Sequence, residues 1–93
     1  MIEERGGVLA VTVPPVMANA RGLLDAGRLH LNSGKVFFDF GQVVEADSSA
    51  VAVMLGLIRS ARQSGADVQF SNVPAGVRCL IELYGVAELI QIV

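Results

Sequence analysis

The sequence predicts a single α/β domain, residues 1–93, whose sheet is at least partly parallel. Strand-like and helix-like segments alternate in the order β-α-β-α-β-α-β, which favours right-handed crossovers between parallel strands. The 93 residues suffice for one modest core and not for two. Hydrophobic residues make up 53% of the chain against 17% charged, which excludes a disordered tail.

The first strand and the first helix are predicted in the N-terminal third. The segment GVLAVTV (7–13) is rich in β-formers, and two prolines end it. The segment VMANARGLLDAG then carries apolar residues at helical spacing: Val16, Ala20, Leu23 and Leu24. Gly27 is expected to stop this helix.

The middle of the chain predicts a central strand followed by a long helix. The segment KVFFDF (35–40) is apolar on both sides, with Phe38 facing one way and Phe37 the other. This pattern is typical of a strand that helices cover. The loop GQVVEAD leads into a helix from about Ser48 to Ser64, which Gly65 ends.

The C-terminal third predicts a short strand, a helix and an extended end. The segment DVQF (67–70) alternates like a strand, and Pro74 opens the next helix. The apolar stripe of that helix consists of Val77, Leu80, Ile81 and Tyr84. Gly85 supplies a left-handed cap, and ELIQIV forms a short strand or an extended tail.

Charge and composition exclude several partners. The net charge is −2 and no basic run exists, so a nucleic-acid partner is not expected. The single cysteine, Cys79, cannot form an intrachain disulfide. No apolar run approaches the roughly 20 residues that span a bilayer, and two prolines break the only signal-like segment. We therefore expect a soluble cytoplasmic protein without direct membrane insertion.

Residues suited to catalysis are few. His30 and Cys79 are far apart in sequence and lack metal-ligand spacing, and no phosphate-binding or nucleophile motif occurs. Asp39, Glu45 and Asp47 suggest a carboxylate site, but closing a strand, solvation and helix capping are the favoured explanations for them. The sequence therefore predicts binding rather than turnover, with no catalytic residue, cofactor or metal.

The long helix separates into a core face and a small outer face. Placed at about 100° per residue, one arc is apolar: Ala50, Val51, Val53, Met54, Leu57, Ile58 and Ala61. The opposite arc begins with a strip of small residues, Ser48, Ala52 and Gly56. A glycine inside a helix costs about 1 kcal/mol relative to alanine, whereas a small strip lets another backbone approach. The pattern alone does not decide whether this outer face is a docking surface or a surface without a binding role.

Two roles are compatible with the serines at the start of this helix. Asp47 and Ser48 are residue types that cap helix N-termini. A phosphate on either serine would be favoured by the helix dipole and opposed by the charge of Asp47. The sequence does not distinguish a phosphate acceptor from a capping serine.

The segment VFFDFGQVVEADSSAVAVMLGLIRSARQSGADVQFSNVP (36–74) resembles the STAS domain of anti-sigma factor antagonists and sulfate-transporter tails. The tail IELYGVAELI resembles the stand-alone MlaB branch, a subunit of the bacterial ABC transporter that maintains outer-membrane lipid asymmetry. The resemblance implies a SpoIIAA-like fold, with a mixed sheet and helices packed largely on one face. It also implies a non-catalytic accessory subunit that binds the ATPase of a phospholipid transporter, peripheral to the inner membrane.

The resemblance assigns roles to residues of the long helix. In MlaB-like proteins the hydroxyl residue after the aspartate, here Ser48, contacts the ATPase subunit with the helix behind it. The expected partner-binding residues are Asp47, Ser48, Ser49, Ala52, Leu55, Gly56 and Arg59, and Cys79 and Leu83 extend this patch. In anti-sigma factor antagonists the second serine of the motif is phosphorylated, which corresponds to Ser49, although Ala50 stands here in place of the family's glycine.

Three alternatives stay open at this point. The chain could act as an anti-sigma factor antagonist regulated by phosphorylation of Ser49. It could be a small enzyme or a lipid carrier, for which it would need a cavity. Self-association into a homodimer is a third alternative.

Overall fold

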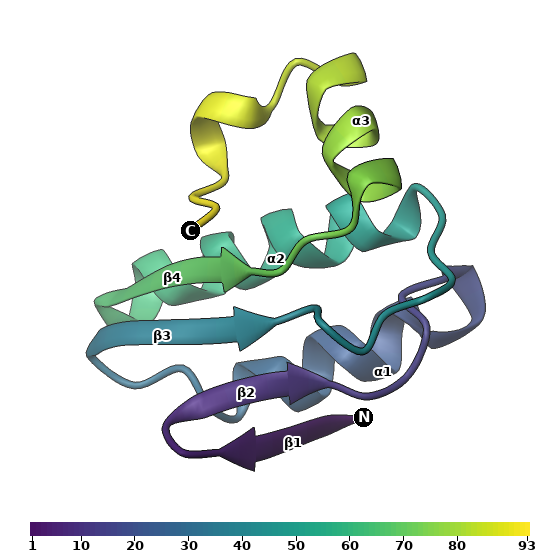
Figure 1. The fold of residues 1–93 in the computed structure, drawn as a ribbon. Helices are drawn as coiled ribbons and strands as arrows, with labels where there is room; N and C mark the ends of the chain where they lie inside the picture. Colours follow the sequence, from purple (N-terminus) through teal and green to yellow (C-terminus); the bar gives the residue numbers. More distant parts are fainter.

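Four strands form one mixed sheet in the computed structural model, which describes residues 1–93 (Figure 1). The strands lie in chain order across the sheet: β1 (Ile2–Arg5), β2 (Val8–Val11), β3 (Gly34–Asp39) and β4 (Ala66–Ser71). The β1–β2 pairing is antiparallel, and the β2–β3 and β3–β4 pairings are parallel. The predicted mixed α/β sheet is confirmed.

Three helices connect and follow the parallel strands: α1 (Met17–Arg28), α2 (Ser49–Ser64) and α3 (Ala75–Leu83). Figure 1 shows α1 and α2 side by side behind the sheet, with α3 beyond the start of α2. A 3₁₀ turn, η1 (Ala87–Leu89), precedes the C-terminal tail. None of these helices is long and apolar enough to cross a lipid bilayer.

The edge strand β1 lies outside the predicted elements. Three of its four residues are charged, so it lacks the apolar alternation that marks a half-buried strand. It pairs with β2 through a two-residue turn, Gly6-Gly7, in which both residues have positive φ (57° and 84°). The structure therefore has a strand at its start that the sequence did not predict. Its C-terminal segment is an extended tail and not a strand, because only a single bridge joins Ile92 to Phe70.

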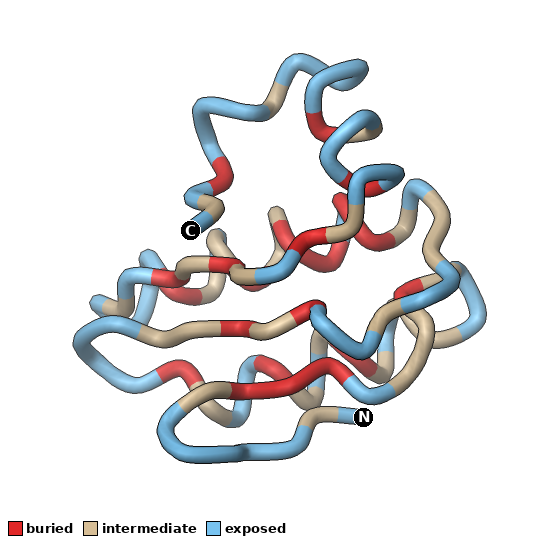
Figure 2. Tube along the Cα trace, in the orientation of Figure 1, coloured by how far each residue is buried: buried red, intermediate tan, exposed pale blue.

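The core lies between the sheet and the helices. Every residue that the sequence placed on the apolar arc of α2 is buried except Ile58, which is half-buried. Opposite them, Phe38 and Phe70 are fully buried on adjacent strands, with ring centroids 5.9 Å apart. Figure 2 shows this buried layer along β2, β4 and α2, and β1 exposed at the edge.

Helices do not cover the second face of the sheet, although the pattern of β3 suggested that they would. Phe37 pairs with Val8 on one side and with Gln69 on the other, and all three residues remain partly exposed. Figure 1 places α1 and α2 together on the opposite side. The expectation that helices cover both faces of β3 is therefore wrong, whereas helices packed largely on one face are confirmed.

Gly27 does not end its helix. It lies inside α1 and is buried, and a Cβ atom at this position would stand 2.7 Å from Cδ2 of Leu57. The glycine is required because α1 and α2 approach closely here. Gly65 and Gly85 do adopt the predicted left-handed conformation, with φ of 73° and 69°.

This contact predicts opposite effects for two glycine substitutions in helices. Gly27→Ala should lower the free energy of unfolding by about 1–2 kcal/mol, because Leu57 must move within a packed core. Gly76→Ala, in the first turn of α3, should be neutral or stabilise by up to about 1 kcal/mol, because nothing lies within 4 Å of its added methyl group. Urea denaturation followed by circular dichroism measures both, and equal effects would contradict the close-approach argument.

Candidate functional site

One carboxylate joins the starts of two helices. Oδ1 of Asp47 accepts a hydrogen bond from the backbone N–H of Ser49 at 2.8 Å, and Oδ2 accepts one from the N–H of Met17 at 3.1 Å. Asp47 thereby caps α2 in the manner the sequence suggested. It also caps α1, whose own cap position, Val16, has no side chain that can accept a hydrogen bond.

The same two donors lower the pKa of Asp47. The Ser49 N–H contributes most and the Met17 N–H second, and both place the pKa of the carboxyl below its ordinary value of 3.8. Two helix N-termini also present positive dipole ends to this carboxylate. Asp47 is therefore ionised near neutral pH and holds the first turn of α2 in position.

The outer face of α2 behind Asp47 is open to solvent and small. Ser48 and Ala52 are exposed, and Leu55, one turn further, is half-buried. A shallow hollow of about 340 Å³ lies there, lined by Ser48, Val51, Ala52, Leu55 and Tyr84. We call these five residues the α2 face. Arg59 is exposed one turn beyond Leu55.

Tyr84 is a member of this face that the sequence analysis assigned elsewhere. It was expected on the buried stripe of α3, but it follows the last helical turn and keeps 51% of its surface exposed. Val77 and Ile81 of that stripe are buried as predicted. A half-exposed tyrosine beside small residues is a common feature of protein interfaces, which is the signal that could have identified it.

The absence of a side chain at Gly56 is explained by a contact within the domain. It is half-buried, and a Cβ atom there would lie 2.9 Å from Cδ1 of Leu24 in α1. The structure therefore supplies a reason for this glycine within the domain, because Leu24 occupies the space, and its contact with an outside partner stays a prediction. Ser48 and Ala52 remain open to solvent, so the strip is shorter than the sequence suggested.

The two serines differ in accessibility. Ser48 is exposed and its backbone is already helical, whereas Ser49 is half-buried beside the Asp47 carboxylate that its N–H contacts. A phosphate on Ser49 would meet that negative charge.

The other polar residues singled out in the sequence lie apart from the α2 face. Asp39 accepts hydrogen bonds from the Gly41 N–H and the Asn72 amide, at 2.8 and 2.9 Å, as expected for a residue that closes a strand. Glu45 is exposed, and the carboxylates do not gather into one site. Cys79 and Leu83 are exposed on α3.

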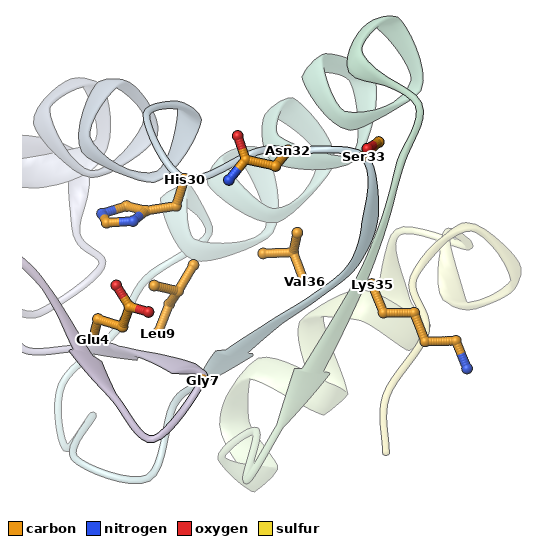
Figure 3. Close-up of a pocket in the computed structure, with 8 residues that line it drawn as sticks. All are labelled: Glu4, Gly7, Leu9, His30, Asn32, Ser33, Lys35 and Val36. Atoms are coloured by element: carbon orange, nitrogen blue, oxygen red, sulfur yellow. The ribbon is translucent and has the colours of Figure 1, made fainter.

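A separate polar pocket of about 270 Å³ lies where β2 and β3 begin (Figure 3). The side chains of Glu4 and His30 extend toward it, and Lys35 points away. His30 is half-buried just after the end of α1. Ser33 and His30 both line this pocket, and no hydrogen bond joins their side chains.

Comparison with known families identifies the type of domain. The family model described as "Mlab, STAS domain" matches residues 3–91. The chain belongs to this family. STAS domains are protein-interaction modules and are in general not catalytic.

Solved structures show the same fold at low sequence identity. The anti-sigma factor antagonist SpoIIAA in its unphosphorylated form matches with a TM-score of 0.74 and 14% identity, over 100% of this chain and 86% of that chain. A candidate anti-sigma factor antagonist from Thermotoga maritima matches with a TM-score of 0.75 and 16% identity, over 99% and 83%. A search of curated protein sequences found no match. The predicted SpoIIAA-like fold is confirmed.

The two hydrogen bonds of Asp47 predict a pH-dependent stability. Asp47→Asn keeps the shape, removes the charge and replaces one of the two acceptor oxygens with an NH2 donor, so it should lower the melting temperature at pH 7 by on the order of 5 °C. Because the folded-state pKa lies below the unfolded one, this stabilisation is complete above the ordinary value of 3.8 and is lost as pH falls through the folded pKa. The difference between wild type and variant should therefore shrink as the pH is lowered below 3.8.

Melting curves between about pH 7 and pH 3 test this expectation. Glu45→Gln is the matched control, since it neutralises an exposed carboxylate two residues earlier in the same loop. A difference that stays constant with pH would mean that shape, and not charge, accounts for the role of Asp47.

Proposed function

We propose that this STAS domain is a non-catalytic accessory subunit that binds the ATPase of a phospholipid-transporting ABC complex, which maintains outer-membrane lipid asymmetry. Membership of the Mlab family supports this partner class. The observation that carries the proposal is the α2 face: exposed Ser48 and Ala52 beside a shallow apolar hollow, at a helix start that Asp47 holds rigid.

Each residue of the surface then has a distinct role. Ser48 offers a hydroxyl at the centre of the contact, and Leu55 and Tyr84 add apolar area around Ala52. Asp47 acts as a positioning residue, because both of its oxygens already accept hydrogen bonds within the domain. Ser49 and Gly56 support the surface from below, and Arg59 lies at its rim. Cys79 and Leu83 extend the contact along α3.

The domain would act through a difference in affinity. A partner shifts the equilibrium between two states of an ATPase only by binding one state more tightly. A surface held in place before binding loses little conformational entropy on association, and that loss would otherwise weaken the complex. Binding through the α2 face would therefore favour the assembled ATPase and keep the domain peripheral to the inner membrane.

A lipid-carrier function is less well supported. The hollows measured on the domain are between about 160 and 340 Å³ and lie open at the surface. The space between sheet and helices is filled by a cluster of 18 buried apolar residues. No enclosed space for two acyl chains exists in this arrangement, so the surface contact remains the better-supported function.

A bulky residue on the α2 face should block the ATPase. We expect Ala52→Trp to raise the dissociation constant at least about 100-fold, because the side chain occupies the centre of the contact. The melting temperature should change little, since Ala52 is exposed. Isothermal titration with the purified ATPase subunit measures this effect.

Gln63→Trp is the matched control, because it places the same side chain at an exposed position in the last turn of α2. It should bind like wild type. Equal binding by Ala52→Trp and the control would remove the α2 face from the proposal. Gly56→Leu is unsuitable here, because the added side chain would collide with Leu24 inside the domain.

A second candidate function is that of an anti-sigma factor antagonist regulated by phosphorylation. The likeness of the fold to SpoIIAA, described in its unphosphorylated form, favours this candidate. The site works against it, because Ser49 is half-buried beside the ionised Asp47.

Incubation with an anti-sigma factor serine kinase and ATP separates the two functions. We expect the intact mass of the protein to stay unchanged. A gain of one phosphate (about 80 Da by mass spectrometry) that Ser49→Ala abolishes and Ser48→Ala retains would support the antagonist instead.

A further inference from the structure

Charge is distributed unevenly between the helix layer and the rest of the domain. The helices α1 and α2 together carry four arginines and one acid, whereas the remaining residues carry three basic and eight acidic side chains. The net charge of −2 conceals this separation. The outer side of the α1–α2 layer is therefore basic on a protein that is acidic overall.

One of these arginines lines a hollow between the two helices, and two others lie further along the same helices. Arg21 lines a hollow of about 220 Å³ together with Ala20, Leu24, Ala52 and Val53. Further along the same two helices, beyond this hollow, Nε of Arg28 donates a hydrogen bond to Oγ of Ser60 at 2.8 Å. Arg59, the residue before Ser60, is exposed there. We call the hollow together with Arg21, Arg28 and Arg59 the basic groove.

The basic groove is continuous with the α2 face. Ala52 lines both hollows, one toward α1 and one toward Tyr84. A partner seated on the α2 face would therefore extend into the groove. Arg21 and Arg28 are seven residues apart, so their positions along α1 are separated by about 10 Å, or two helical turns.

We propose that the basic groove binds an acidic segment of the partner ATPase, with carboxylates about two turns apart and an apolar side chain between them. The apolar side chain enters the hollow beside Ala52, while the carboxylates pair with Arg21 at one end and with Arg28 and Arg59 at the other. This inference rests on the proposed function and specifies the chemistry of the partner's surface.

The composition of the groove favours a protein segment over an anionic membrane. All its cations are arginines, whose planar guanidinium groups match carboxylates in a two-pronged geometry. Asp25 lies among them, 3.4 Å from Arg21 and 3.7 Å from Arg28. Stable electrostatic binding to a membrane requires a denser cluster of four to eight basic residues, roughly, without such an acid.

Association kinetics with the ATPase subunit test the inference. Stopped-flow measurements from about 20 mM to about 500 mM salt should show the wild-type association rate constant falling at least about tenfold. The double variant Arg21→Gln/Arg59→Gln should associate about three- to tenfold more slowly at low salt and depend less on salt. Its melting temperature serves as the check on folding.

The variant Arg5→Gln/Lys35→Gln is the matched control, because it removes the same charge from exposed residues on β1 and β3. It should behave like wild type. Equal rates for the two double variants, with tight wild-type binding, would overturn the acidic-segment proposal and leave the proposed function intact. Absence of wild-type binding would overturn both.

Vesicles of phosphatidylglycerol provide the competing probe. We expect no co-sedimentation of the wild-type domain with them at about 150 mM salt. Co-sedimentation that is lost in Arg21→Gln/Arg59→Gln, while ATPase binding is unchanged, would assign the groove to a membrane surface and overturn the proposal.

Discussion

The carboxylate of Asp47 is the contact on which the arrangement of this domain depends. The helices α1 and α2 run side by side in the same direction, so their positive N-terminal ends come together. A single ionised group between them, one oxygen for each helix, offsets that repulsion and satisfies a free N–H of each. The position of Ser48, and with it the start of the α2 face, follows from this contact.

Close packing of the same two helices determines which residues remain available outside. Gly27 and Gly56 allow Leu57 and Leu24 to fill the space between α1 and α2. The large side chains of Leu24 and Leu57 therefore pack inside the domain, and the exposed side of α2 carries the small residues Ser48 and Ala52. The residues that pack α2 against α1 are therefore different from those that we propose for partner binding.

The membership in the Mlab STAS family and the geometry of the surface support each other. An interaction module needs a rigid patch more than it needs reactive groups, and the polar residues here act mainly as caps and strand ends. The basic groove would orient a charged partner as it approaches that patch. Long-range attraction acts before contact and orients a charged partner, while the apolar hollow contributes after contact.

The sequence by itself determined the features that depend on local periodicity. The extent of α2, its buried arc and the left-handed glycines at Gly65 and Gly85 were all predictable, because each depends on residues a few positions apart. The mixed sheet and the start of the α2 face were predictable from the order of elements and from the resemblance to the STAS family.

Only the tertiary structure decided the features that depend on residues distant in sequence. The contact of Asp47 with Met17 joins positions 30 residues apart, and Gly27 and Gly56 have their roles only because α1 lies against α2. Strand β1 exists because β2 supplies its hydrogen-bond partners, and Tyr84 joins the α2 face because α3 ends beside it. A periodic pattern records which side of an element is apolar, but packing determines what that side touches.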